Sequence, residues 1–505
     1  MRTRFGIALV VSTGLALTAC SSSPPKAAEI STITIMTPFL EAQPPAAGDT
    51  VQKALEKITG KKIAITWTPN SSYEDKTNIT MASGDLPDVM VIQGKTPGFI
   101  KNANAGAFWD LDPYLKDFPD LVSKSPAIQA NASVNGKIFG IYRARDAMRT
   151  AVILRKDWLD KLGLKAPKTV EDLYNVAKAF TNDDPDGDGK KDTYGLIVPK
   201  WAGINTASPY DFLATWFGAG NAWVERNNKL VPNFTTDEWL QANKYIKRFV
   251  DEGLINPDYA TMDSTAWNQP FFTGKGGIII DVQSRATVLI DLFKTQDPKT
   301  FQNYVDITGN LVGPSGKLVA QPTDGYSGFL AIPKSSVKTE AELRTVLTFL
   351  SKLNSPKAAV LINNGIEGVN FTLDGNLTVP VTPLTPQGAE VTQAVKSYAQ
   401  LGMNVAGGYY LPKQATPYEQ AMFDKRMKIQ TSDLTHAAYN PAAPYVSATQ
   451  IAKGAQLDNI IADARIQYFA GQLDEQGVRN AIKLWRSSGG DAVISEINAL
   501  HTKVK

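Results

Sequence analysis

The chain has 505 residues and a formal net charge of +3, from 52 basic and 49 acidic side chains. Charges of the two signs are interspersed rather than grouped, which argues against nucleic acid as a partner. The length exceeds what one hydrophobic core normally organises, so two lobes are expected. After the first 20 residues, no segment is long and apolar enough to cross a membrane.

The first 20 residues have the features of an export signal. Arg2 and Arg4 precede a short apolar segment at 6–17, and residues 17–20 read Leu-Thr-Ala-Cys. An apolar core this short is typical of a signal peptide rather than of a membrane span. Cys20 is the only cysteine of the chain and therefore has no disulfide partner.

The segment 1–20 resembles the signal peptide of a bacterial lipoprotein. This resemblance implies that Cys20 is lipidated, becomes the mature N-terminus and anchors the protein at the extracytoplasmic face of the cell membrane. An ordinary cleaved signal with an incidental cysteine is the alternative. Residues 21–29 are rich in serine, proline and alanine and predict a flexible tether.

From residue 30 onward, strand and helix patterns alternate along the chain. The strand patterns alternate polar with apolar residues or are wholly apolar, and the helix patterns have apolar residues at helical spacing. Such alternation predicts a parallel or mixed α/β sheet. The predicted elements are strands at 31–36, 62–67 and 89–92 and helices at 51–59 and 74–82.

Ligands of such sheets bind beyond the carboxyl ends of the strands. The residues that follow the first and third predicted strands therefore form candidate binding loops, with Phe39 and Gln93 as candidate contacts. Further along the chain, 156–162 predicts an amphipathic helix, and 277–281 and 327–333 predict buried strands near the ligand.

Six short stretches, spread over nearly the whole chain after the signal, carry a family resemblance. They are ASGDLPDV at 82–89, VNGKIFGI at 134–141, RKDWLDKLG at 155–163, FTGKGGI at 272–278, GIEGVNF at 365–371 and WRSSGG at 485–490. In order and spacing they resemble the family 1 extracellular solute-binding proteins of sugar ABC importers, especially the lipoprotein members similar to alginate-binding proteins. The resemblance implies a periplasmic-binding-protein-like fold, with two α/β lobes, a hinge and a ligand cleft between the lobes.

The division of the chain into lobes follows from this implied fold. The N-terminal lobe is expected to comprise residues 30–143 and 284–326, and the C-terminal lobe residues 144–283 and 327–505. The C-terminal lobe would then carry the acidic loop 183–195. The protein is expected to act as a monomer.

The loop 183–195 has the spacing of a calcium-binding loop. Counted from Asp184, aspartates stand at the first, third, fifth and ninth positions, with a glycine at the sixth. Four carboxylates this close together would repel one another strongly without a cation. Gly195 stands where an EF-hand has a bidentate glutamate, so another group must complete the shell.

The loop resembles the calcium site of alginate-binding-like solute receptors, which implies a structural rather than a catalytic calcium ion. Some of those receptors have an acidic residue where this chain has Thr193, so the last ligand is left open. A solvated acidic turn that binds no ion is the alternative. The implied ligands are Asp184, Asp186, Asp188, the Lys190 carbonyl, Asp192 and Thr193.

Motifs of an enzyme are few. His436 and His501 have no metal spacing, Cys20 is committed to lipid, and neither a phosphate loop nor a serine nucleophile elbow is present. We therefore predict a binding protein rather than an enzyme. Two carboxylates suffice for glycoside hydrolysis, so a secreted glycosidase or lyase is the main alternative. A structural adhesin is less favoured, because no internal repeat is visible.

Aromatic and basic side chains supply candidate ligand contacts. Trp201 and Trp267 are predicted to stack on sugar rings, with packing in the core as the alternative for each. Arg143 and Arg145 stand in the expected first crossing between the lobes, after residues 140–142, and face either the cleft or the solvent. If both face the cleft, an acidic glycan such as a uronate is favoured, because guanidinium groups bind carboxylates in a bidentate manner.

Three further residues at strand or turn ends are candidates for binding sugar hydroxyls, namely Asp281, Tyr326 and Glu367. The two acids among them favour neutral sugars, so the charge of the ligand stays open. The predicted function is capture of a carbohydrate, in the form of an oligosaccharide, by domain closure and its delivery to an ABC transporter permease. A peptide receptor is the alternative among binding proteins.

Overall fold

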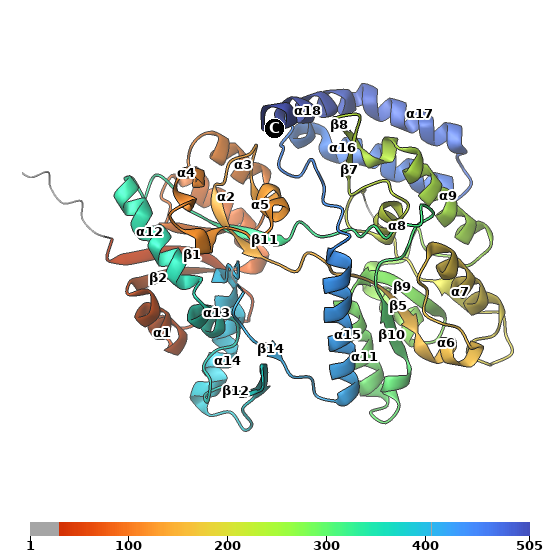
Figure 1. Ribbon diagram of the computed structural model, residues 1–505, viewed down its shortest axis with the longest axis horizontal. Coiled ribbons are helices and arrows are strands. Elements are labelled where there is room, and N and C mark those ends of the chain that lie inside the picture. The colour runs from red at the N-terminus through yellow and green to blue at the C-terminus, as the bar shows by residue number, and fades with distance from the viewer. Residues whose placement is uncertain (1–29, 202, 406, 505) are drawn as a thin grey trace, which may run out of the picture.

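The computed structural model describes residues 30–504 apart from 202 and 406. It has two lobes, each built on its own sheet and packed against helices (Figure 1). The predicted two-lobed α/β architecture is therefore confirmed. The signal peptide, the tether and the lipidation of Cys20 fall outside the described residues. None of the described helices is both long and apolar enough to span a membrane.

The first lobe is built on a five-stranded sheet. Its strands are β1 (Thr32–Phe39), β2 (Lys62–Pro69), β3 (Val89–Ile92), β4 (Gly140–Ala144) and β11 (Tyr326–Ala331). They lie in the order β2-β1-β3-β11-β4, and β11 runs antiparallel to both of its neighbours. The three strands predicted near the N-terminus are confirmed. β1 continues to Phe39, so this residue ends a strand and does not stand in a loop.

Both helices predicted near the N-terminus of this lobe are confirmed. The first of them shows its sequence signals clearly: the Asp49 carboxylate accepts a hydrogen bond from the Gln52 amide, and Gly60 ends the helix with φ 72°. The helices are α1 (Thr50–Thr59), α2 (Tyr73–Ser83), α3 (Pro97–Asn104), α4 (Asp112–Leu115), α5 (Pro126–Ala132), α12 (Glu340–Leu353), α13 (Pro356–Asn363) and α14 (Pro386–Tyr398). A small sheet is formed by β12 (Phe371–Asp374), β13 (Leu377–Pro380) and β14 (Leu411–Pro412).

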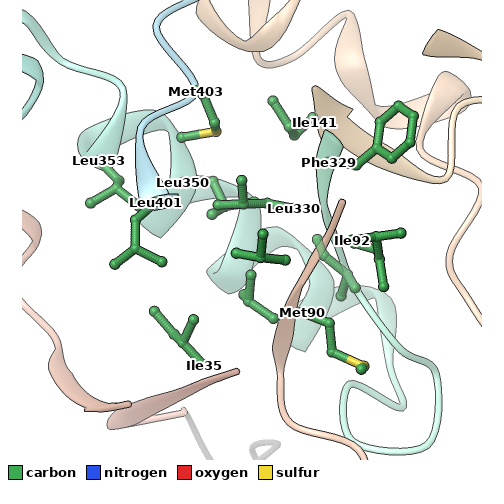
Figure 2. Packing of buried hydrophobic residues seen from close by; sticks show 14 of the residues in the cluster. Ile35, Met90, Ile92, Ile141, Phe329, Leu330, Leu350, Leu353, Leu401 and Met403 are labelled. Atoms are coloured by element: carbon green, nitrogen blue, oxygen red, sulfur yellow. The ribbon is translucent and has the colours of Figure 1, made fainter. Parts of the chain in front are cut away.

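The core of the first lobe joins segments that are far apart in the sequence. Figure 2 shows Ile35, Met90 and Ile141 of the first half in one cluster with Leu330 of β11 and Leu350 of α12. Each of these five side chains is at most 1% exposed. Residues after 326 therefore complete the core that residues before 144 begin.

The second lobe is built on a four-stranded sheet in the order β10-β5-β9-β6. β5 is antiparallel to both β9 and β10, whereas β6 is parallel to β9. The strands are β5 (Thr150–Arg155), β6 (Tyr194–Leu196), β9 (Gly276–Val282) and β10 (Val305–Thr308), with a separate hairpin of β7 (Trp223–Arg226) and β8 (Lys229–Pro232).

Helices of the second lobe come from the middle and the end of the chain. The helix predicted at 156–162 is confirmed as α6. In the core, Gly277 of β9 has no room for a side chain, because a Cβ atom there would lie 2.2 Å from the Phe180 ring. The helices are α6 (Lys156–Leu162), α7 (Val170–Asn182), α8 (Pro209–Trp216), α9 (Asp237–Asp251), α10 (Asn268–Phe272), α11 (Ser284–Gln296), α15 (Pro417–Leu434), α16 (Ala448–Phe469), α17 (Glu475–Trp485) and α18 (Asp491–Val504).

Sheet membership corrects two of the expected lobe segments. Residues 284–326 were assigned to the first lobe, but they include α11 and β10, which pack in the second. Residues 327–505 were assigned to the second lobe, but β11 and α12 to α14 pack in the first. The apolar pattern predicts that these segments are buried, and the partner sheet is decided by pairing between strands that are distant in the sequence.

A buried ion pair fixes a loop of the second lobe against α16. Arg465 Nη1 lies 3.4 Å from Asp211 Oδ1, and the two side chains are 1% and 5% exposed. Arg465 Nη2 also donates to the Gly203 carbonyl at 2.8 Å. The Asp211 carboxylate accepts from the backbone amides of Thr206 at 2.9 Å and Ser208 at 3.1 Å. Loss of either partner would leave a buried charge without its counterion.

We predict that Arg465→Met lowers the free energy of unfolding by about 3–5 kcal/mol, because Asp211 stays buried without its cation. Arg479→Met is the control, since its pair with Asp237 is 51% and 85% exposed and contributes only about 0–1 kcal/mol. Urea unfolding of both variants measures the difference. Equal losses in the two variants would contradict the prediction.

Candidate functional site

Three segments join the two lobes: 145–149 between β4 and β5, 309–325 between β10 and β11, and 413–416 between β14 and α15. α15 then lies along the second lobe on the side that faces the first (Figure 1). The first two segments are hydrogen-bonded to each other, and the last residue of β4 is bonded to the chain that leads to β14. These bonds run from Ala144 N to Met403 O (2.7 Å), from Arg145 N to Gly325 O (3.0 Å) and from Thr323 N to Ala147 O (2.7 Å).

A cavity of about 530 Å³ is lined by residues of both lobes. Lys95 and Ile100 line it from the first lobe, opposite Trp223 and Phe234 of the second. The segment 440–447, which precedes α16, forms another part of its wall. Its lining combines aromatic and apolar side chains with about as much polar surface, which suits a solute that has both hydroxyl groups and apolar faces.

Lys95 ties the segment before α16 to the first lobe. Its Nζ donates to the carbonyls of Asn131 at 2.6 Å and Ser133 at 3.1 Å in the first lobe, and to the carbonyl of Ala443. Burial lowers the pKa of this ammonium group to about 8. Three carbonyl acceptors on two segments make Lys95 an inter-lobe contact that sequence reasoning missed, because a lone lysine after a strand has no distinguishing pattern.

The two predicted tryptophans lie together but differ in exposure. Trp201 is half-buried, its Nε1 donates to Thr206 Oγ1 at 2.7 Å, and it lines a second cavity of about 300 Å³ with Asp463. Trp267 is only 1% exposed, and its ring is covered by Trp201 and by the Arg285 guanidinium, 4.0 Å from the ring centroid. Trp267 is therefore a core residue in this structure, and the prediction that it stacks on a sugar is corrected.

The two predicted arginines are not equivalent. Arg143 is 9% exposed and donates to the carbonyls of Ser327 at 3.0 Å and Ala399 at 3.5 Å. Burial lowers the pKa of Arg143 to about 10. Arg143 thus connects the end of the first sheet to the segment after α14, whereas Arg145, in the first crossing segment, is exposed. The pair predicted to face a ligand together is reduced to Arg145.

The predicted hydroxyl-binding residues Asp281 and Tyr326 both interact with neighbouring side chains of the protein. Asp281 is 6% exposed and forms an ion pair with Arg285, one turn further along the chain. The Tyr326 ring packs 5.0 Å from that of Phe329, and burial raises the pKa of its hydroxyl. Asp281 therefore has its counterion already in place.

Three predicted contacts remain, namely Phe39, Gln93 and Glu367. Within the described residues, no side-chain hydrogen bond or ion pair joins any of them to the second lobe. Phe39 is half-buried at the end of β1, and Gln93 is exposed, with its Nε2 donating to Asn70 Oδ1 at 2.7 Å. Glu367 is exposed in the turn before β12. These three residues stay predictions.

Two basic groups near Arg145 were not predicted. Arg149 is half-buried before β5, and Arg426 is half-buried on α15. Burial lowers the pKa of Arg149, and the charges of Arg145 and Arg426 lower it further, so the three groups lie near one another. Arg149 belongs to the same basic stretch as Arg145 and could have been found there. Arg426 is distant in the sequence, and no local signal marks it.

The loop that connects α7 to β6 brings three of the predicted calcium ligands together. Carboxylate oxygens of Asp184, Asp186 and Asp188 lie within 4.8 Å of one another. The Gly187 amide donates to Asp184 Oδ1 at 3.0 Å and orients that carboxylate. Hard oxygen ligands converging from alternate positions fit a calcium ion.

The other side chains of the predicted calcium shell point to different partners. The Asp192 carboxylate forms an ion pair with Lys275. Thr193 is buried, and its hydroxyl donates to the Phe180 carbonyl at 2.9 Å. The Lys190 ammonium pairs with Asp188 at 2.9 Å. A calcium ion that binds the triad would therefore have to displace the Lys190 ammonium group from the Asp188 carboxylate.

A model of the family of bacterial extracellular solute-binding proteins matches residues 41–360. The chain belongs to this family. Its members bind solutes and do not transform them, so the prediction of a binding protein rather than an enzyme is confirmed. The glycosidase or lyase alternative is not supported.

Two relatives extend over almost the whole of this solute-binding protein. Lipoprotein LipO of Bacillus subtilis (strain 168) is 46% identical over 475 residues, which cover 94% of this chain and 93% of that protein. The polygalacturonan/rhamnogalacturonan-binding protein YtcQ of the same organism is 33% identical, and the match covers 99% of this chain and 98% of that protein.

Solved structures show the same fold. An extracellular solute-binding protein of Bifidobacterium longum subsp. infantis superposes with a TM-score of 0.68 at 20% identity, over 94% of this chain and 98% of the other. The alginate-binding protein AlgQ2, described without calcium ion, superposes with a TM-score of 0.61 at 18% identity, over 94% and 98%. At these identities the likeness concerns the fold alone.

We predict that Lys95→Met lowers the free energy of unfolding of this solute-binding protein by about 1.5–3 kcal/mol, because buried carbonyls lose a charged donor. Lys101→Met, at an exposed position of α3, is the control and is expected to change it by less than about 0.5 kcal/mol. Thermal and urea unfolding of both variants check this. A Lys95 variant as stable as the control would show that the three contacts contribute nothing.

Proposed function

We propose that this protein captures an oligosaccharide between its lobes and delivers it to the permease of an ABC transporter. A lipid on Cys20 would hold it at the outer face of the cell membrane. The observation that carries the proposal is 33% identity over 99% of the chain to a protein named for polygalacturonan and rhamnogalacturonan binding. The name of the 46% identical relative, a lipoprotein, supports the anchor.

The arrangement of the lobes supports capture by closure. The chain crosses between the lobes three times, and the first two crossings are bonded to each other. Two compact lobes on such a junction can move as rigid bodies about it. A solute that contacts both lobes favours the closed state by its higher affinity for that state. The permease then recognises the loaded receptor by the shape of its closed state.

We predict that a soluble form starting after Cys20 is stabilised in a saturable way by one class of oligosaccharide. A concentration 100-fold above the dissociation constant should raise the free energy of unfolding by about 2.7 kcal/mol. Thermal-shift screening against neutral oligosaccharides, oligouronates and peptides measures this, with chromatography of each mixture for products. Stabilisation by peptides alone, or conversion of a glycan, would contradict the proposal.

We further propose that the triad of Asp184, Asp186 and Asp188 binds a calcium ion that stabilises the second lobe. The carboxylate oxygens already lie within 4.8 Å of one another, and like charges at that spacing repel without a cation. The triad lies on the loop between α7 and β6, so the ion would fix the connection between a helix and a strand of one lobe. Its role is structural, because every carboxylate serves as a ligand.

Calcium is expected to raise the free energy of unfolding of chelator-treated protein by about 2.7 kcal/mol at 100 times its dissociation constant. Asp186→Asn should weaken this effect, because it removes one charge from the shell. Asp183→Asn is the matched control, since Asp183 caps α7 and stands outside the triad. Calorimetric titration that detects no calcium binding to the unsubstituted protein would refute the site.

A further inference from the structure

The junction between the lobes carries more positive than negative charge. Arg145 and Arg149 stand in the first crossing segment, and Arg426 stands on α15. The acidic groups whose charges act on Arg149 are Asp146 and Asp281. Asp146 also acts on Arg426. At the junction, three guanidinium groups therefore interact with only two carboxylates.

One of these carboxylates is already neutralised. Asp281 forms an ion pair with Arg285 of α11, and the two side chains are 9% and 22% exposed. By contrast, no salt bridge connects Arg145, Arg149 or Arg426 to another residue in the part of the chain that the structure describes. Asp146, which is exposed, is the acidic group that remains for three cations.

Backbone and side-chain bonds hold two of the cations at one corner of the second sheet. The Arg149 carbonyl accepts from the Gln283 amide at 2.7 Å, which places Arg149 beside the end of β9. Arg426 Nη1 donates to Thr287 Oγ1 of α11 at 3.1 Å. Arg426 Nε is buried and has no hydrogen-bond partner among the described residues. The corner lies where the first crossing segment leaves the second lobe for the first.

An exposed aromatic side chain lies on the first-lobe side of the junction. Tyr409 is 41% exposed and lines a cavity of about 430 Å³ together with Asn364 and Leu411 of the first lobe. Burial raises the pKa of its hydroxyl, and the charge of Asp146 raises it further. An exposed ring beside guanidinium groups combines the two contacts that an acidic sugar needs. The ring stacks on the C–H face of the sugar, and the guanidinium groups bind its carboxylate.

Partial burial of these cations is costly when they have no counterion. Loss of solvation lowers the pKa of both Arg149 and Arg426, although each stays charged under ordinary conditions. A carboxylate that reaches the corner would supply the missing negative charge. Planar guanidinium groups match carboxylates in a bidentate geometry that an ammonium group cannot reproduce.

We propose that Arg149 and Arg426 form a carboxylate subsite and that the captured solute is an oligosaccharide that contains uronic acid residues. The exposed ring of Tyr409 would stack on a sugar ring from the first-lobe side, and the exposed Arg145 adds positive charge at the junction. The proposal rests on the proposed function, because it takes the solute to be an oligosaccharide. It resolves the charge preference that the sequence left open, since Asp281 is paired and Glu367 stands in a turn before β12.

The test is calorimetric titration of the purified protein with trigalacturonate, with its methyl ester and with a neutral trisaccharide. The ester has the shape of the acid without its charge. The acid is expected to bind at least about tenfold more tightly than the ester, and Arg149→Gln or Arg426→Gln should each reduce that affinity about 10- to 100-fold. Neither substitution should change the affinity for the ester by more than about threefold.

Lys428→Gln is the matched control, because it removes one positive charge from an exposed position of the same helix. It should leave the affinity for trigalacturonate within about twofold. Thermal unfolding verifies that each variant is folded, and if Arg149→Gln is unfolded, Arg426→Gln decides. Equal affinity for acid and ester, or loss with Lys428→Gln as large as with Arg426→Gln, would overturn the carboxylate subsite alone. Binding of no trisaccharide, together with binding of a non-sugar solute, would refute the proposed function instead.

Discussion

The insertion of β11 between β3 and β4 is the constraint on which the two-lobed arrangement depends. After the chain has built the second sheet, it must return, because the first sheet lacks a strand between two buried neighbours. Phe329, Leu330 and Ala331 are at most 1% exposed in that position. Once β11 is in place, the chain has crossed between the lobes twice, and α15 requires a third crossing. The first two crossings bond to each other at the junction between the lobes.

The junction between the lobes brings together the side chains on which the proposed function depends. Side chains from three distant segments meet there, and each lobe keeps a separate hydrophobic core. Lobes that are packed independently can change their relative position without repacking either core, which would be costly at native packing density. The polar groups at the junction, including Lys95 and the arginines, bond to backbone or remain hydrated. They can therefore exchange partners when a solute enters, whereas the buried Arg465–Asp211 pair cannot.

Local signals predicted the elements well, and contacts between distant segments account for what was missed. Alternation and capping placed β1 to β3, α1 and α6, because these patterns are set by neighbouring residues. The lobe assignment of residues 284–401 was wrong, because the apolar pattern of a strand does not indicate which sheet the strand joins. Trp267 was misplaced for the same reason: a tryptophan in a polar stretch is enclosed only by residues distant in the sequence, here Trp201 and Arg285. Arg426 could not be found at all, because only the fold brings α15 to the first crossing.

If the solute is captured by closure as proposed, unpaired guanidinium groups at the junction make selection depend on its charge. Closure removes water and lowers the effective dielectric constant, so repulsion between like charges grows as the lobes approach. A neutral solute would leave that repulsion uncompensated and would favour the closed state less. With an anionic solute the electrostatic energy of closure becomes favourable, because each carboxylate of the solute pairs with a guanidinium group that closure desolvates. Since a ligand shifts the lobes only by its difference in affinity between open and closed states, the junction converts solute charge directly into closure.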